Sequence, residues 1–373
     1  MRLPRRMRAA TATVGLTCAA ALTLAACGSD SGGSDSGGSD SGGSGSGGSD
    51  SGEIRIVAST NVWGSVAQAV AGDRAQVQSL ITEPSADPHS YEASPADAAA
   101  ISDASLVVYN GGGYDQFVDD ILDSTGAGAA TVDAMALFES GTGSDLDDGH
   151  DHSAGSHSAG SAPEDGTHEG ETHATEEHEA ESHAAEEGDA HAGHDHSGIN
   201  EHVWYDLAAA DAVAHAVADR LAELDPAGAD TYRANADAFH SQLHEVTDVT
   251  AAIAAAHANT PVAQTESIGY YLVTSAKLED RTPADFTNAI ENGTDPSPAA
   301  IAATRQLLLD KQVDVLVHNP QTEDKVSRDM RATAESAGIP VVEVTETLPE
   351  GVDYIQWQKQ TAEALAAALD AAR

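Results

Sequence analysis

Ile54-Arg55-Ile56-Val57-Ala58-Ser59-Thr60-Asn61 is the most informative stretch for the architecture of this 373-residue chain. Its first five residues have the composition of a β-strand. Thr60 and Asn61 follow at once with the polar side chains that begin helices, and the apolar run behind them stops near Gly72. A strand that passes directly into a helix predicts the first unit of an α/β fold.

The same alternation continues along the chain. We expect further strands at 76–82, 106–109, 262–264, 313–317 and 341–344. We expect helices that begin at Ser94-Pro95 and Ser297-Pro298, cover 207–224 and 229–257, lie near Tyr270, end near Ala337, and start near Asp353. The fold class is therefore α/β: two lobes (53–225 and 258–373), each with a mostly parallel sheet flanked by helices, joined by one long rigid helix at 226–257.

The N-terminus has the pattern of an export signal. Four arginines precede a short apolar run that ends in Leu24-Ala25-Ala26-Cys27-Gly28. This ending resembles the lipobox of bacterial lipoproteins, although Cys27 could also simply end an ordinary signal. We expect residues 1–26 to be removed, Cys27 to be lipidated, and residues 27–52, rich in Gly, Ser and Asp, to tether an extracytoplasmic protein to the cell membrane.

Charge and cysteine content exclude several classes of protein. The formal net charge of −44 leaves little to neutralise phosphate, so we expect no nucleic-acid partner. Cys18 lies in the signal, so the mature chain has one cysteine, and neither an internal disulfide nor a thiolate metal site is possible. We expect a monomer whose acidity attracts cations.

Residues 140–198 are rich in histidine and acid and hold no large apolar side chain beyond Leu146. We expect this stretch to be a disordered insertion in the first lobe, because it has nothing to bury against the entropy cost of ordering. Its imidazoles and carboxylates suit a loose, low-affinity, metal-collecting role, although such a tract can also be mere spacer. The histidines concerned are His150, His152, His157, His168, His173, His178, His183, His191, His194 and His196.

Four polar segments follow predicted strands or the insertion, and ligands of parallel sheets bind near the carboxyl ends of strands. They are Asp87-Pro88-His89-Ser90-Tyr91-Glu92, Asn200-Glu201-His202-Val203-Trp204-Tyr205-Asp206, Gln264-Thr265-Glu266-Ser267-Ile268-Gly269-Tyr270 and Thr345-Glu346-Thr347-Leu348. Taken singly, each has an ordinary alternative: His89 as a turn residue, His202 as a packed imidazole, and Glu266 or Glu346 as an acid at a helix start.

Together these segments resemble a known family, the metal-binding lipoproteins of bacterial ABC importers for zinc and manganese, from Glu53 to Arg373. Pro88-His89-Ser90-Tyr91-Glu92 is similar to the family's Pro-His-x-x-Glu motif, and His202-Val203-Trp204-Tyr205-Asp206 to its His-x-Trp-x-Asp motif. Thr294-Asp295-Pro296-Ser297-Pro298 is similar to Glu-Pro-Ser-Pro, and the His-rich insertion lies where the family often has one. The resemblance implies a two-lobed receptor whose metal ligands are His89, His202, Glu266 and Glu346.

The third and fourth ligands depart from the zinc pattern. Zinc members usually have histidine where this chain has Glu266, manganese members have glutamate there, and the fourth ligand is usually aspartate rather than Glu346. Carboxylates suit manganese, whereas the affinity order and the histidine tract favour zinc. We therefore expect Zn²⁺, with Mn²⁺ as the alternative.

The expected function is capture of Zn²⁺ outside the cytoplasm and delivery to an ABC permease that works with a separate ATPase. A surface metal buffer or adhesin without transport stays open. A secreted zinc hydrolase is disfavoured, because the chain has neither a His-Glu-x-x-His helix nor a nucleophile elbow, so we expect no enzyme. Asp206, Tyr91 and His318 are candidates for orienting the ligands, and we expect the remaining histidines to lie at the surface or between lobes: His215, His240, His244 and His257.

Overall fold

The first sheet begins with the strand expected at the start of the folded region. The computed structural model describes residues 53–83, 86, 88–142 and 199–372. Strand β1 (Arg55–Thr60) is buried from Ile56 onward and pairs in parallel with β2 (Gln76–Ile81) on one side and β3 (Leu106–Tyr109) on the other. Strand β4 (Ala130–Asp133) pairs in parallel with β3, giving the order β2-β1-β3-β4.

The second sheet repeats this plan. Its strands are β5 (Pro261–Gln264), β6 (Glu279–Asp280), β7 (Val315–His318) and β8 (Val341–Glu343), all parallel, in the order β6-β5-β7-β8. In both sheets the first strand of the lobe lies inside, so its carboxyl end is flanked by loops from its neighbours. The polar segments with His89, Glu266 and Glu346 follow the strands β2, β5 and β8.

Helices cover both sheets, as the alternating pattern predicts. The first lobe contains α1 (Asn61–Ala71), α2 (Pro95–Ser102), α3 (Gln116–Thr125), α4 (Ala134–Glu139) and α5 (Leu207–Leu224). The second contains α7 (Tyr270–Ser275), α8 (Ala284–Glu291), α9 (Pro298–Leu309), α10 (Lys325–Ala337) and α11 (Tyr354–Ala371). The 3₁₀ turns η1 (Pro88–Ser90), η2 (Val203–Tyr205) and η3 (Ser267–Gly269) lie in loops.

The helix starts follow the capping chemistry in the sequence. The Thr60 side chain accepts a hydrogen bond from the backbone N–H of Trp63 and so caps α1. Ser94 forms a capping box with Asp97, and Pro95 occupies the first turn of α2. Ser297 caps α9 by accepting a hydrogen bond from the Ala300 backbone N–H, with Pro298 in the first turn. The Pro296-Ser297-Pro298 motif therefore serves as a helix start in this structure.

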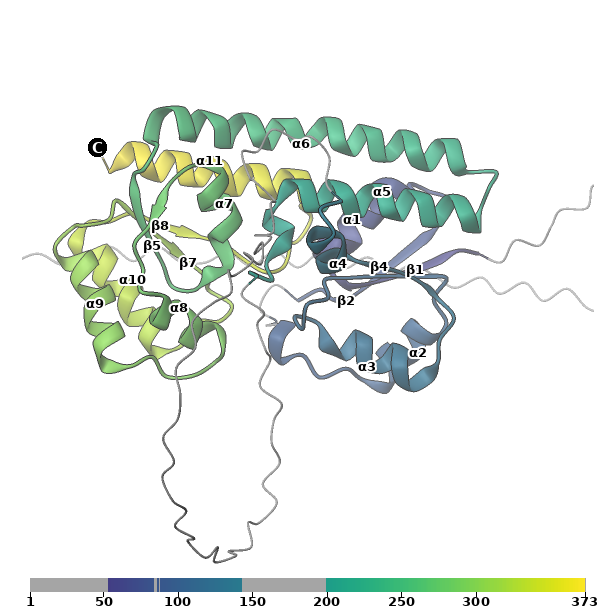
Figure 1. Cartoon of the computed structure of the whole chain (residues 1–373), viewed down its shortest axis with the longest axis horizontal. Coiled ribbons are helices and arrows are strands. Elements are labelled where there is room, and N and C mark those ends of the chain that lie inside the picture. The colour runs from purple at the N-terminus through teal and green to yellow at the C-terminus, as the bar shows by residue number, and fades with distance from the viewer. Residues whose placement is uncertain (1–52, 84–85, 87, 143–198, 373) are drawn as a thin grey trace, which may run out of the picture. The chain divides into compact units, whose positions relative to one another are not determined.

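Helix α6 (Ala229–His257) connects the two sheets. It has 29 residues and is thus about 43 Å long. One face of α6 is buried. Along this face, α6 packs against α5 and against α11 (Figure 1). Because α11 belongs to the last part of the chain and α5 to the first lobe, one helix surface supports both. The long connecting helix expected from the sequence is present.

Some elements were not expected from the sequence. They are α3, β4, α4, β6 and α8. The expected insertion begins just after α4, and its ten histidines, like Cys27 and the signal, lie outside the described residues. Among the helices that the structure describes, none is long and apolar enough to cross a membrane.

Candidate metal centre

His89 lies in η1, in the loop that follows β2, and its side chain is 21% exposed. Its Nε2 is 3.7 Å from Oε2 of Glu346, and its Nδ1 is 3.4 Å from Oε1 of Glu201. The ring also meets the Tyr114 ring edge-on, with 4.8 Å between centroids. The imidazole is thus held between a carboxylate of its own lobe and one of the other lobe.

His202 is fully buried immediately before η2. The Oδ1 atom of Asn200 accepts a hydrogen bond from the His202 backbone N–H at 2.9 Å and lies 3.0 Å from its Nδ1. Asn200 is itself anchored, because its amide donates to the Ser267 carbonyl and its carbonyl accepts from the Tyr271 hydroxyl. Because Asn200 orients the ring through Nδ1, Nε2 is the ring atom that would coordinate a metal.

Glu346 follows β8 and is 1% exposed. Its Oε2 accepts a hydrogen bond from the Tyr114 hydroxyl at 2.9 Å, and its Oε1 accepts one from the Asn319 amide at 2.8 Å. Tyr114 belongs to the first lobe and Asn319 to the second. The carboxylate is therefore a contact point between lobes.

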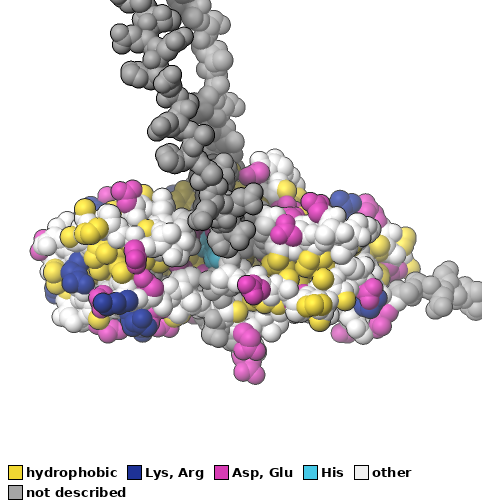
Figure 2. Space-filling view, turned by 90° about the horizontal axis from the view of Figure 1, so that it is seen from below, with side chains coloured by type: hydrophobic (Ala, Val, Ile, Leu, Met, Phe, Trp, Pro, Cys, Tyr) yellow, Lys and Arg dark blue, Asp and Glu magenta, His cyan; other side chains and the backbone are white. Residues whose placement is uncertain are grey.

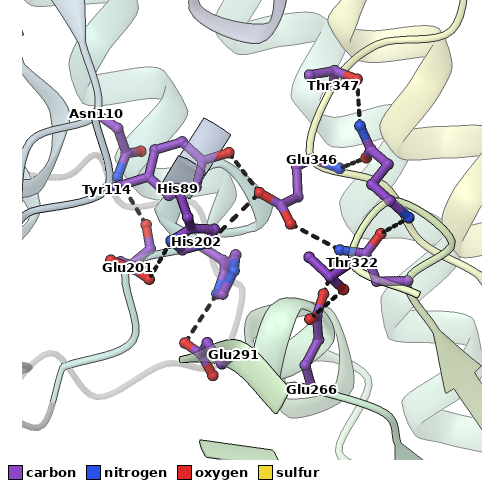
Figure 3. A network of polar contacts seen from close by, with 12 residues as sticks. His89, Asn110, Tyr114, Glu201, His202, Glu266, Glu291, Thr322, Glu346 and Thr347 are labelled. Carbon is purple, nitrogen blue, oxygen red and sulfur yellow. Dashed lines mark hydrogen bonds and ion pairs between the residues drawn. The ribbon is translucent and has the colours of Figure 1, made fainter. Parts of the chain in front are cut away.

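His89, His202 and Glu346 together form a group in which one ligand atom of each lies within 4.8 Å of the others (Figure 3). Donors that share a tetrahedral zinc ion through bonds of about 2.0 Å lie about 3.3 Å apart. The His89–Glu346 distance of 3.7 Å is close to that value. Small side-chain movements would bring the three donors onto one ion.

Glu266 lies next to this group, 1% exposed, at the loop after β5. Asn319 donates to its Oε1 and Thr322 to its Oε2, the latter at 2.6 Å. Burial and, after it, the nearby Glu346 raise the pKa of Glu266 well above its usual value. The same Asn319 amide bonds both glutamates, so Glu266 is linked to the group but is not one of its three members. Its assignment as the third ligand stays a prediction.

Sequence reasoning missed two further carboxylates. Glu201 and Glu291 form a second group with His202, with one ligand atom of each within 4.8 Å of the others. Glu201 is 2% exposed, and burial, followed by Glu291 and Glu346, raises its pKa to about 8. Its position beside His202 was the only signal in the sequence, whereas Glu291, at the end of α8, gave none.

For Tyr91 and His318, two of the residues expected to orient the ligands, the structure shows partners outside the centre, whereas the expectation for Asp206 stays a prediction. The Tyr91 hydroxyl donates to Asp97 at 3.0 Å. Asp206 accepts from the Ala209 backbone and caps α5. His318 is buried with its Nε2 3.1 Å from Glu323, and burial lowers its pKa. Its chain neighbour Asn319 is the residue that reaches the carboxylates, since successive side chains point to opposite sides of a strand end.

The surface view shows histidine on one face of the folded part. In Figure 2 a histidine side chain is visible near the middle of this face, between the two ends of the folded part, with Asp and Glu side chains around it. Acidic surroundings favour the approach of a cation over that of an anion.

Three comparisons with solved structures agree on the fold. The periplasmic zinc-binding protein TroA of Treponema pallidum superposes with a TM-score of 0.61 at 13% identity, covering 85% of this chain and 99% of that one. The manganese-bound protein FpvC of Pseudomonas aeruginosa gives 0.58 at 19% identity, over 86% and 99%. The laminin-binding adhesin Lmb of Streptococcus agalactiae gives 0.58 at 18% identity, over 85% and 99%.

Sequence comparison adds a relative and a family. The manganese-binding lipoprotein MntA of Halalkalibacterium halodurans is 25% identical over 198 residues, which is 52% of this chain and only 47% of that protein. The model of the family described as zinc-uptake complex component A, periplasmic, matches residues 56–368. Since that match spans both lobes and the metal centre, the chain belongs to this ZnuA family of metal-binding, solute-binding proteins of ABC importers.

Proposed function

We propose that this protein captures Zn²⁺ outside the cytoplasm and delivers it to an ABC permease powered by a separate ATPase. The observation that carries the proposal is the convergence of His89, His202 and Glu346, whose donor atoms lie within 4.8 Å of one another. Two imidazoles and a carboxylate are a common zinc set, and Glu266 or water would complete the shell. The cation is the cargo, and members of the family bind and release it rather than react with it.

The division of donors between lobes supports delivery as well as capture. His89 and His202 lie in the first lobe and Glu346 in the second, so an ion bound by all three favours one arrangement of the lobes. A permease that recognises this arrangement would distinguish loaded from empty receptor. Release then requires only that contact with the permease separates the two sides of the site.

The choice of zinc rests on affinity order. At a given site of nitrogen and oxygen donors, Zn²⁺ binds more tightly than Mn²⁺. The three convergent donors include both imidazoles, while the extra carboxylate of Glu266 is engaged by Asn319 and Thr322. A histidine tract at 150–196 also suits zinc better than manganese.

A manganese receptor is the second candidate. Glu266 and Glu346 are both buried at the centre, and hard oxygen donors are what Mn²⁺ prefers. MntA, one of the relatives that match in sequence, is a manganese-binding lipoprotein. Accumulation of isotopically labelled Zn²⁺ or Mn²⁺ by vesicles with the permease, ATPase and receptor separates the two. Accumulation of neither metal favours a surface buffer or adhesin.

Attachment to the cell membrane through a lipidated Cys27 completes the proposal. The tether at 27–52 would let the receptor reach the permease while it stays near the membrane. Mass spectrometry of the mature protein tests this, because a diacylglyceryl group on an N-terminal Cys27 is expected.

Calorimetry with His89→Ala tests the capture site. Removal of one of three converging donors should weaken Zn²⁺ binding by more than the roughly 10- to 100-fold that loss of a residue behind a ligand typically costs. The matched control is Tyr91→Phe, which alters the same loop but removes a hydroxyl that bonds Asp97 rather than the centre. Unchanged tight binding in His89→Ala would refute the proposed site, whereas weakening in both variants would mean that the loop rather than the donor matters.

A further inference from the structure

We propose that helices α5 and α6 hold a second divalent-metal site, built from Asp211, His215 and His240 and separate from the centre between the lobes. One ligand atom of each of these residues lies within 4.8 Å of the others. Two imidazoles and one carboxylate are borderline donors that suit Zn²⁺ or a similar first-row transition-metal ion.

The helical spacing places the donors together. Asp211 and His215 are one turn apart on α5 and so share a face. His240 reaches them from α6, which packs along α5. Oδ1 of Asp211 is 3.2 Å from Nδ1 of His240 and 3.7 Å from Nε2 of His215. Donors on a tetrahedral zinc ion are about 3.3 Å apart, so these two distances are close to those in a bound site.

Burial of the carboxylate points to a cation as its partner. Asp211 is completely buried within α5, and its two oxygens accept no hydrogen bond from any of the described residues. The Nδ1 atom of His240 likewise makes no hydrogen bond among the described residues, although it faces Asp211. A buried carboxylate without such compensation is costly, and a metal ion between these atoms would satisfy both.

An ion can reach this position from solvent. The side chains of His215 and His240 are 43% and 33% exposed, while Asp211 forms the floor beneath them. His244, one turn beyond His240 on α6, stacks edge-on against it with 5.2 Å between ring centroids. Water or the His244 imidazole would take the fourth position, because three protein donors leave a zinc ion one coordination place.

A metal at this place would join α5 to the helix that connects the two sheets. Any ligand that binds only the folded state stabilises it by mass action. Zinc at this second site would therefore stabilise the packing of α5 of the first lobe against α6, whether or not the centre between the lobes holds its cargo ion.

Metal counting on the full-length chain tests the proposal. The number of zinc ions bound per chain is measured at a buffered concentration of free Zn²⁺ for the parent, His215→Ala and Asp211→Asn. The control is His257→Ala, which removes another imidazole of α6 that pairs with Asp370 at 3.0 Å, remote from the cluster. Both site variants should bind one zinc ion fewer than the parent and the control, while His89→Ala combined with His215→Ala should bind two fewer. Ions held by other histidines cancel in these differences.

His215→Ala decides the matter if Asp211→Asn fails to fold, because His215 is partly exposed and its truncation leaves the helix core intact. A parent zinc count retained by folded His215→Ala would overturn the proposal. The proposal would also be overturned if crystals of the full chain soaked in zinc gave an anomalous difference map at the zinc edge with no peak between Asp211 and His240. A peak there, with the loss of one ion in His215→Ala, supports the site.

Discussion

The Tyr114 hydroxyl donates a hydrogen bond to Oε2 of Glu346 at 2.9 Å, and this bond joins the two lobes at the same oxygen that faces His89. Gln321, whose amide donates to the Ala86 carbonyl and to Thr347, links them a second time. The lobes are therefore held together by hydrogen bonds that do not depend on a metal. Glu346 serves both as a lobe contact and as a proposed ligand.

Tyr114→Phe should consequently weaken metal binding only moderately. The variant loses one hydrogen bond to a charged acceptor, worth about 1.5 to 3 kcal/mol, but keeps every donor to the ion. We expect Zn²⁺ affinity to fall about 10- to 100-fold by calorimetry, with the stoichiometry of tight binding unchanged. A complete loss of tight binding, equal to that in His89→Ala, would show that the tyrosine itself is indispensable to the site.

Glu201→Gln tests the carboxylate that lies 3.4 Å from Nδ1 of His89. Carboxylates behind a ligand imidazole fix its orientation and raise its basicity, and their removal typically costs 10- to 100-fold in affinity. We expect a loss of about that size in a zinc competition assay with a chelating dye.

The matched control is Glu323→Gln. Glu323 contacts His318 as Glu201 contacts His89, but this His–Glu pair lies outside the centre. Affinity should be unchanged in that variant. An equal loss in both variants, or none in Glu201→Gln, would contradict an orienting role for Glu201.

Sequence alone gave the α/β class, the two lobes and the long helix, because Ile54–Ala58 and the capped helix after it have strong local signals. It also directed attention to His89, His202 and Glu346, which the structure brings together. It could not show that Asn319 would hold Glu266, or that Glu291 would reach His202, because a side chain's partner across a loop depends on packing of distant segments. Short strands such as β4 escape notice for the same reason: their neighbours, rather than their composition, stabilise them.

Metal-free protein should lose stability as pH rises from about 5 to 8. The pKa of Glu201 is about 8 in the folded state and near 4.5 in an exposed glutamate, so between these values the folded chain keeps a proton that the unfolded chain releases. Buried Glu266, whose pKa is also raised, acts in the same direction. We expect the melting temperature in chelator to fall by several degrees over this range.

Glu201→Gln separates this effect from other titrations, because glutamine stays neutral at every pH. Its melting temperature should depend on pH less steeply than that of the parent, by differential scanning calorimetry. Parallel pH profiles of the two proteins would be incompatible with a proton held on Glu201. The opposing contribution from His318, whose pKa burial lowers, is the same in both and leaves the comparison intact.

Replacement of residues 141–196 by a short Gly-Ser linker should leave tight binding between the lobes intact and lower the total zinc bound. His202 depends for its position on Asn200, which bonds Ser267 and Tyr271 of the other lobe, and all of these residues survive the replacement. The removed stretch takes away ten imidazoles that can collect metal loosely. Calorimetry should give a dissociation constant within about threefold of the parent value, and equilibrium dialysis at excess Zn²⁺ should give fewer ions. Since the sites of the folded residues remain in both proteins, an unchanged ion count would mean that the histidine tract binds no zinc, and a lost tight site would mean that it supplies a ligand to the centre.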